Sequence, residues 1–265
     1  MKKYFCLILS TVLMLTFLGC GKDAQAPAET TEPQISDLYE WEDVEGGVQI
    51  TKYKGSATKI KIPAVIESKA VVSIGLTFSG NMVIEEIELP ESVISANFAG
   101  CKNLVRLTAH GDIKISEFVM TDCTSLKYLC LDGLTTIHSN LTLRIPNSVE
   151  ELDLSGLEEL RLYCFSSGSA LKKIDLSSVK QIFKEYHSWD ADLQEVILNP
   201  EIKYYAPASY SNRDGSYPAG SIFDDSVEEK KRKEITEKNS AQVFCEIFQQ
   251  DTIIINGVTY QHSDK

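Results

Sequence analysis

Acidic residues recur at one place in a repeated pattern of this chain, and paired carboxyl groups are what glycoside hydrolases use to cleave sugar bonds. Glu88, Asp153 and Asp175 each stand between the last two apolar residues of an L-x-x-L-x-L segment. Such catalysis requires one carboxyl group in an apolar pocket that raises its pKa, whereas a solvated strand face offers no such pocket. The pattern therefore favours a non-catalytic protein.

The histidines, cysteines, serines and glycines of the chain do not have the spacing of known catalytic, metal-binding or phosphate-binding motifs. No H-x-H, H-E-x-x-H, C-x-x-C or G-x-S-x-G motif occurs, and the glycines form no phosphate-binding loop. The basic run Lys230–Lys233 is flanked by glutamates, which indicates a solvated helix face rather than a phosphate site. We therefore predict no catalytic residue, no metal site and no cofactor. The four histidines, which are not clustered, are His110, His138, His187 and His262.

Seven cysteines occur in the chain, and their spacing indicates neither a zinc site nor a full disulfide framework. Cys101 and Cys123 each lie three residues before the first leucine of a repeat, so they occupy equivalent positions in adjacent repeats. Neighbouring strands lie about 4.8 Å apart, a separation that disulfide geometry permits. The sequence leaves two interpretations open, a disulfide bond between them or two buried free thiols.

Six segments share the pattern L-x-x-L-x-L, and their fold determines where the acidic residues and cysteines described above lie. Their first residues stand 20, 22, 23, 22 and 22 positions apart, a period typical of leucine-rich repeats. One such repeat cannot bury its apolar side alone, whereas a stack of repeats buries a continuous core. The predicted fold is a β-rich leucine-rich-repeat solenoid with parallel strands on its concave face and a cap at both ends. The segments are Ile84–Leu89, Leu104–Ala109, Leu126–Leu131, Val149–Leu154, Leu171–Leu176 and Leu193–Leu198.

Strand side chains alternate between two faces, so the residues between the leucines should face outward on the concave sheet. This alternation predicts a candidate binding surface made of Glu86, Glu88, Arg106, Tyr128, Glu151, Asp153, Lys173 and Asp175. Two further apolar columns should stack the convex side. One consists of Ile74, Ile94, Ile115, Ile137, Leu160 and Ile182, and the other of Phe78, Phe98, Met120, Leu143 and Phe165, with His187 in the last repeat.

Two of the repeats carry a motif that points to a known family. Phe98-Ala-Gly-Cys-Lys-Asn-Leu104 and Thr121-Asp-Cys-Thr-Ser-Leu126 resemble the A-F-x-x-C-x-x-L segment of BspA-like leucine-rich repeats. The stretch Gly46–Thr58, followed by Ile60-Lys-Ile-Pro63, resembles the same family, and the likeness covers about residues 46 to 200. The resemblance implies a non-catalytic surface protein of Bacteroidetes type that binds other proteins, host matrix or cell-surface partners.

The N-terminus is a targeting segment. Lys2 and Lys3 precede an apolar stretch, Cys6–Leu18, that is too short for an ordinary membrane span. Phe17-Leu18-Gly19-Cys20 resembles a bacterial lipobox, which implies cleavage before Cys20 and a lipid anchor on that residue. The alternative is an ordinary secretory signal in which Cys20 is incidental.

The charge of the chain excludes one class of partner. Of the 26 basic residues, all but Lys2 and Lys3 lie beyond the signal segment, so 24 basic against 38 acidic side chains give the mature chain a formal charge of −14. An acidic protein repels phosphate backbones, so nucleic acid is not expected to bind.

Composition divides the chain into five parts: 1–19 lipoprotein signal peptide, 20–37 disordered tether, 38–74 N-terminal β cap, 75–200 leucine-rich repeats, and 201–265 C-terminal cap. In the first cap, alternation predicts a hairpin of Val48–Tyr53 with Lys59–Pro63. In the last part we expect a long loop over Asn199–Gly220, a helix from Ser226 to about Phe248, and a hairpin turning at Asn256-Gly257.

Exposed aromatic residues give a second candidate site near the C-terminal end of the repeats. Tyrosine and tryptophan are favoured at recognition surfaces, although the same side chains could instead pack the loop onto the C-terminal cap. The candidate binding residues are Tyr186, Trp189, Tyr204, Tyr205, Tyr210 and Tyr217.

These observations favour a protein-binding lipoprotein of the cell envelope, anchored in the outer membrane by lipid alone and facing either the periplasm or the surface. The alternative is a glycan-binding accessory lipoprotein of a polysaccharide-uptake system, with the aromatic loop as its binding site. In either case the ligand is a protein or a glycan.

Overall fold

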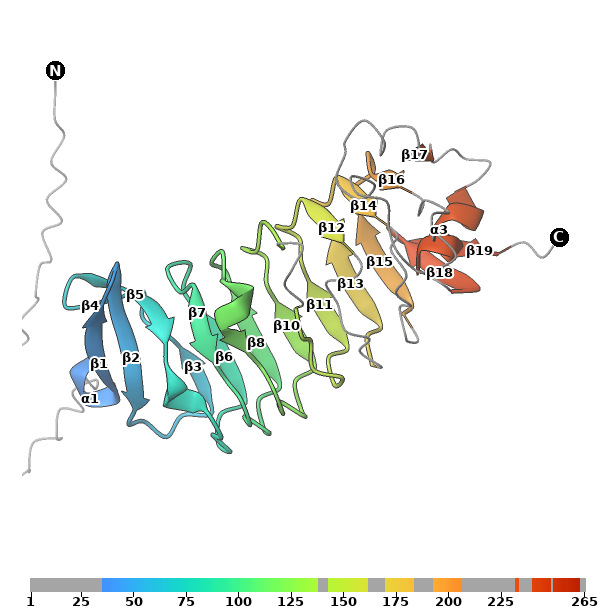
Figure 1. Ribbon diagram of the computed structural model, residues 1–265. Helices are drawn as coiled ribbons and strands as arrows, with labels where there is room; N and C mark the ends of the chain where they lie inside the picture. Colours follow the sequence, from blue (N-terminus) through green and yellow to red (C-terminus); the bar gives the residue numbers. More distant parts are fainter. Residues whose placement is uncertain are drawn as a thin grey trace, which may run out of the picture. The chain divides into compact units, whose positions relative to one another are not determined.

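Short strands joined by tight turns make up almost all of the described chain (Figure 1). The computed structural model describes residues 35–137, 143–161, 170–183, 193–205, 232–233, 240–248 and 250–262. Its first elements are α1 (Ile35–Leu38), β1 (Tyr39–Val44), β2 (Gly47–Tyr53), β3 (Lys59–Lys61), β4 (Val65–Ile66), β5 (Lys69–Ile74), η1 (Leu76–Phe78), β6 (Glu86–Leu89), β7 (Ser95–Asn97), β8 (Arg106–Ala109), η2 (Ile115–Glu117) and β9 (Phe118–Val119). They are followed by β10 (Tyr128–Cys130), β11 (Glu151–Asp153), β12 (Glu159–Arg161), β13 (Lys173–Leu176), β14 (Gln181–Phe183), β15 (Glu195–Leu198), β16 (Lys203–Tyr205), β17 (Arg232–Lys233), α3 (Ser240–Phe248), β18 (Thr252–Ile255) and β19 (Val258–Gln261).

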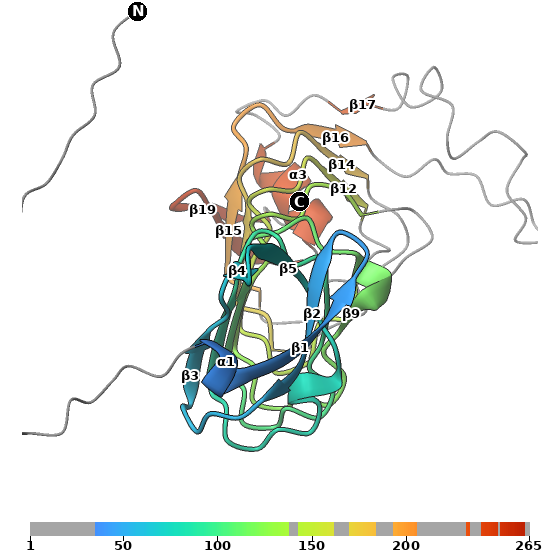
Figure 2. The ribbon, with the colours of Figure 1, turned by 90° about the vertical axis from the view of Figure 1, so that its left-hand side faces the viewer.

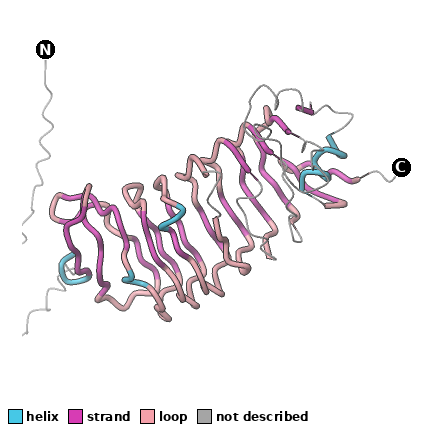
Figure 3. The backbone as a smooth tube through the Cα atoms, viewed as in Figure 1, coloured by secondary structure: helices cyan, strands magenta, loops and turns pink. Residues whose placement is uncertain are grey.

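A nine-stranded sheet runs through all the repeats in the order β19-β18-β15-β13-β11-β10-β8-β6-β3 (Figure 3). From β3 to β18 every neighbouring pair is parallel, and the register places the middle leucine of each repeat beside that of the next. The predicted β-rich leucine-rich-repeat solenoid is therefore confirmed. The aligned interior side chains, each at most 7% exposed, are Ile60, Ile87, Leu107, Leu129, Leu152, Ile174 and Val196.

Two smaller sheets complete the repeats across the interior. One has the order β1-β2-β5-β7-β9, with β4 added to β5, and the other has the order β12-β14-β16-β17. Viewed along the stack, β3 of the large sheet and β2 of the smaller one lie on opposite sides of the interior (Figure 2). Each repeat thus buries apolar side chains from two directions, which a single repeat could not do.

Aromatic rings contact one another along the first repeats. The ring centroids of Tyr53 and Phe78 lie 5.9 Å apart, those of Phe78 and Phe98 6.2 Å, and those of Phe98 and Phe118 6.0 Å. Such pairs contribute about 0.5–1.5 kcal/mol beyond the area they bury. Within the predicted second column, Phe78, Phe98, Met120 and Leu143 are buried, whereas Phe165 and His187 lie outside the described residues.

Glycines allow successive repeats to approach closely at the corners after β8, β10 and β11, where Gly111, Gly133 and Gly156 lie. A Cβ atom on Gly133 would lie 1.8 Å from the carbonyl oxygen of His110, and one on Gly156 would lie 1.9 Å from that of Asp132. No side chain fits at those separations, so these two corners require glycine.

Cys101 and Cys123 are free thiols rather than a disulfide. The Sγ of Cys101 donates to the carbonyl oxygen of Phe78 at 2.7 Å, and that of Cys123 donates to Phe98 at 3.1 Å. Burial raises the pKa of both thiols, that of Cys123 to about 12, so they are unreactive at neutral pH.

The predicted hairpin of Val48–Tyr53 with Lys59–Pro63 is wrong. β2 instead pairs antiparallel with β1 and parallel with β5, while β3 pairs parallel with β6. Ile60 lies beside Ile87 in this register, so the segment that carries β3 forms the first strand of the nine-stranded sheet. This segment has exposed Ala57 in place of the first leucine of the repeat pattern. The repeat period in the sequence therefore did not identify it as a repeat strand.

Two expectations about the C-terminal part are also wrong. The predicted loop Asn199–Gly220 contains strand β16, and the predicted helix from Ser226 contains strand β17, which pairs with β16. Near the end of the predicted helix, α3 (Ser240–Phe248) is helical, and its apolar side chains Val243, Phe244 and Ile247 are buried. At Arg232–Lys233, pairing with β16 outweighs the local helix pattern, and β16 in turn continues the sheet of the preceding repeats through β14.

The predicted C-terminal hairpin is present as β18 and β19, and Asn256 and Gly257 at its turn both have positive φ. The side chain of Asn256 also completes the pairing of the last repeat. Its Oδ1 accepts the backbone N–H of Leu198 at 2.8 Å, and its Nδ2 donates to the Leu198 carbonyl oxygen at 3.0 Å.

Candidate functional site

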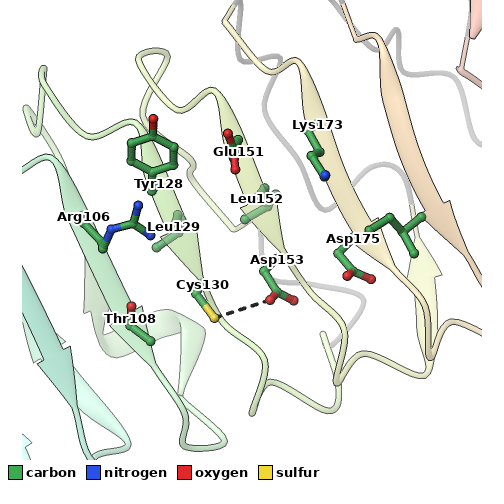
Figure 4. Close-up of a pocket in the computed structure, with 11 residues that line it drawn as sticks. Arg106, Thr108, Tyr128, Leu129, Cys130, Glu151, Leu152, Asp153, Lys173 and Asp175 are labelled. Carbon is green, nitrogen blue, oxygen red and sulfur yellow. Dashed lines mark hydrogen bonds between the residues drawn. The ribbon is translucent and has the colours of Figure 1, made fainter. Parts of the chain in front are cut away.

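A hollow of about 430 Å³ lies on the solvent side of the nine-stranded sheet, which we term the open face (Figure 4). It spans β8, β10, β11, β13 and β15, and we term it the central hollow. The alternation of strand side chains explains its composition, because the leucines of these strands point inward and their neighbours point outward. Its lining residues are Arg106, Thr108, Tyr128, Leu129, Cys130, Glu151, Leu152, Asp153, Lys173, Asp175 and Ile197.

The structure brings six of the eight sequence-predicted residues of this face together in the central hollow: Arg106, Tyr128, Glu151, Asp153, Lys173 and Asp175. The other two, Glu86 and Glu88, lie on β6, nearer the N-terminal end of the sheet. Thr108, Cys130 and Ile197, which the same alternation predicts to face outward, also line the hollow. Their small or apolar side chains gave no chemical signal in the sequence.

Most lysines of the open face are paired with a carboxylate of a neighbouring repeat. The Nζ of Lys59 lies 2.7 Å from Glu86, that of Lys61 lies 2.5 Å from Glu88, and that of Lys173 lies 3.3 Å from Glu195. These pairs are exposed, so each contributes about 0–1 kcal/mol to stability. Their main effect is to cancel the charge of these lysines.

Glu150 forms a bridge between two strands at the edge of this face. Lys127 on one side donates to its Oε1 at 2.8 Å, and Lys172 on the other side donates to its Oε2 at 2.9 Å. Hydrogen bonds from these two ammonium groups lower the pKa of Glu150 to about 2. The carboxylate therefore stays ionised through the whole neutral range.

Arg106 differs from these lysines, because in the described part of the chain no carboxylate lies within ion-pair distance of it. Its guanidinium group lies over the ring of Tyr128, 4.3 Å from the ring centroid (Figure 4). A cation in this position is attracted by the negative face of the ring, which holds the guanidinium group in place. Its N–H groups remain donors for a planar anionic group.

Carboxylates line the opposite side of the central hollow. Asp153 and Asp175 lie side by side on β11 and β13, and each accepts the backbone N–H of the serine two residues later, at 2.8 and 2.9 Å. The thiol of Cys130 lies 3.6 Å from Asp153 Oδ2, and burial raises the pKa of that thiol to about 12. Within the described chain, Glu151 forms no ion pair, and no cluster of His, Cys, Asp or Glu could hold a metal ion.

The aromatic candidate site is only partly described. Tyr186, Trp189, Tyr210 and Tyr217 lie outside the described residues, as does Cys20. Tyr204 and Tyr205 lie on β16, where the register aligns Tyr204 with Ile182 and Tyr205 with Phe183. Ile182 is fully buried in the interior of the preceding repeat. Tyr204 has the same register position one repeat later.

The stacked parallel strands, the aligned leucines and the open face define a leucine-rich-repeat solenoid. The sequence model of the BspA type leucine rich repeat region matches residues 52–155 and 145–215, in six copies. This match covers more than half of the chain, so the chain belongs to the BspA-type leucine-rich-repeat family.

Several solved structures are similar to this chain. A leucine rich repeat protein from T. pallidum is 19% identical over 66% of this chain and 86% of that one, with a TM-score of 0.35. A leucine rich cell surface protein from Faecalibacterium prausnitzii A2-165 is 15% identical, with coverages of 69% and 75% and a TM-score of 0.29. A leucine-rich repeat protein from Bacteroides ovatus is 16% identical, with coverages of 66% and 79% and a TM-score of 0.25. No curated protein matches the chain.

Proposed function

We propose that this protein is a non-catalytic lipoprotein of the cell envelope that recognises a protein partner through the central hollow. The observation that carries the proposal is the placement of Arg106 over Tyr128 inside the hollow, without a carboxylate partner in the described chain. Arginine and tyrosine are enriched among the residues that dominate protein–protein binding energies. A guanidinium group already held over a ring loses little further freedom when it binds.

The form of the open face supports recognition over catalysis. Its side chains come from five adjacent strands and lie on a sheet surface, so they can contact a partner over a broad area. The carboxylates Glu151, Asp153 and Asp175 lie on that same surface rather than in an apolar pocket, which general acid catalysis would require.

The N-terminal segment supports attachment to the envelope. Lys2, Lys3, the apolar stretch and the lipobox-like Phe17–Cys20 favour a lipid anchor on Cys20, in the outer membrane and facing either the periplasm or the surface. No helix in the described ranges has the length and apolar composition needed to cross a membrane. The unmodified protein should incorporate a labelled fatty acid and Cys20→Ala should not, and equal labelling of the two would contradict the anchor.

A glycan ligand is the second candidate function, since aromatic residues cluster in the sequence near the C-terminal end of the repeats. On the open face, however, Arg106 already covers one side of the Tyr128 ring, the surface that would stack against a sugar. The described geometry therefore favours a protein partner at the central hollow.

The proposal is tested by binding the purified protein to an array of matrix and envelope proteins and, in parallel, to a glycan array. We expect a protein ligand whose binding is lost in Arg106→Ala and Tyr128→Ala. Lys180→Ala is the matched control, because Lys180 pairs with Glu158 at 3.0 Å outside the hollow. Glycan binding without protein binding, or unchanged binding by both hollow variants, would contradict the proposal.

A further inference from the structure

The charges of the central hollow are separated along the sheet. Arg106 lies on β8 at one end, while Glu151, Asp153 and Asp175 lie on β11 and β13 at the other. Lys173 does not balance these carboxylates, because its Nζ is paired with Glu195 on the next strand. The hollow is thus positive on one side and negative on the other.

The register gives the distance between the two sides. Arg106 aligns with Tyr128, and Tyr128 aligns with Glu151, so the two charged positions are two strand steps apart. Two steps correspond to about 10 Å across the sheet. A peptide in the polyproline II conformation advances about 3.1 Å per residue with three residues per turn, so side chains three residues apart lie on the same side and span nearly the same distance.

We propose that the partner presents a segment in the polyproline II conformation across these strands, with one acidic and one basic side chain three residues apart. The acidic side chain binds the guanidinium group of Arg106, and the basic side chain lies among Glu151, Asp153 and Asp175. This inference rests on the proposed function, since it names the chemistry of the partner at the same hollow.

Charge complementarity disfavours partner segments that carry two charges of the same sign. A segment with two basic residues would place one of them against Arg106, and a segment with two acidic residues would place one among three carboxylates. Like charges brought together at an interface disfavour the wrong partner. The stacking of Arg106 on Tyr128 favours this position of the guanidinium group, which keeps positive charge on that side of the hollow.

Five fluorescent nonapeptides of serine and threonine test this inference against the purified protein. Three carry charged residues three positions apart, as Asp with Lys, Lys with Lys or Asp with Asp. The fourth carries Asp and Lys as neighbours, and the fifth is uncharged. We expect the peptide with Asp and Lys three positions apart to bind about tenfold more tightly than the others, with affinity falling as salt rises.

Charge reversal gives the decisive measurement. Arg106→Glu should transfer the preference to the peptide with two lysines, and Glu151→Lys should weaken binding of the mixed peptide. Lys180→Glu, outside the hollow, should leave the ranking unchanged, and thermal melts check that all three variants fold. An unchanged ranking in Arg106→Glu, or no ranking in the unmodified protein, would overturn the inference.

The two proposals fail in distinguishable ways. If the peptides show no ranking but Arg106→Ala still loses the protein found on the array, the hollow binds protein and the charge order is wrong. If Arg106→Ala keeps full binding to that protein, the location of the binding site is wrong as well.

Discussion

On the inner side of the nine-stranded sheet, each repeat places a large apolar residue at the same register position, from Ile60 to Val196. On the open side of the same strands, no position carries one residue type in three successive repeats. The inner positions are constrained by packing between neighbours, which accepts little variation in volume. The outer positions are not, so their differences are available for recognition.

The open side itself divides into two regions. In the first repeats, Lys59 and Lys61 meet Glu86 and Glu88, and their charges cancel. In the central hollow, Arg106 and Glu151 have no such partner within the described chain. The same strand positions therefore hold internal ion pairs at one end of the sheet and unpaired groups in the middle.

The largest effect is expected from truncating an inner residue. Leu129→Ala removes a side chain that is 2% exposed between two neighbouring repeats and should lower the free energy of unfolding by about 2–5 kcal/mol. Cys130→Ala, on the open side of the same strand, is the matched control and should have a much smaller effect in urea unfolding. Equal losses would show that the two sides of the sheet are not distinct.

A smaller loss is expected at the stacked corners. Gly133→Ala forces a Cβ atom against the carbonyl oxygen of His110, so the backbone must shift, which should cost about 1–3 kcal/mol. Ser178 occupies the corresponding corner after β13 and is exposed, so Ser178→Ala should be nearly neutral. Thermal melts of both variants measure the difference, and a neutral Gly133→Ala would contradict the close stacking.

The Glu150 bridge gives a pH-dependent effect. Because the pKa of Glu150 is lowered to about 2, its ionised form stabilises the folded state above its ordinary pKa, and this contribution is lost as the pH falls toward 2. The difference in stability between the unmodified protein and Glu150→Gln should therefore be constant above pH 4.5 and shrink below it. Urea unfolding from pH 7 downward measures it, with Glu158→Gln as the control, and a constant difference would contradict the bridge.

The smallest effect is expected from the exposed ion pairs. Lys61→Ala should change stability by about 0–1 kcal/mol, and salt should reduce the change, because solvent screens this pair. Chemical unfolding at low and high salt is the measurement. A loss as large as that of Leu129→Ala would mean that the open side is as tightly constrained as the inner one.

The sequence predicted the leucine columns of the nine-stranded sheet well, because L-x-x-L-x-L segments repeat with a regular period. The predicted column Ile74, Ile94 and Ile115 is wrong in the first repeats, because the register places Ala96 beside Ile74 and Phe118 beside Ala96. The sequence did not predict β3, where Ala57 replaces the first leucine and the β4–β5 hairpin lengthens the spacing to the next repeat. It also did not predict β16, whose three residues are too few to show a period. Pairing with an existing strand, rather than local propensity, determines such short segments.

For the candidate site, alternation alone identified which residues of each repeat face outward. It could not show which of them would be paired, because that depends on neighbours more than twenty residues away. The pairing of Glu86 with Lys59 depends on β3, so the isolation of Arg106 became visible only with the register of the whole sheet.

The hydrogen bonds of Asn256 have a consequence for the length of the solenoid. The side-chain amide of Asn256 forms hydrogen bonds with both the N–H and the carbonyl oxygen of Leu198, as a residue of a neighbouring strand would. This junction involves only β15 and the terminal hairpin, so whole repeats can be gained or lost upstream without disturbing it. The number of repeats can therefore change in evolution while the C-terminal hairpin that ends the sheet stays the same.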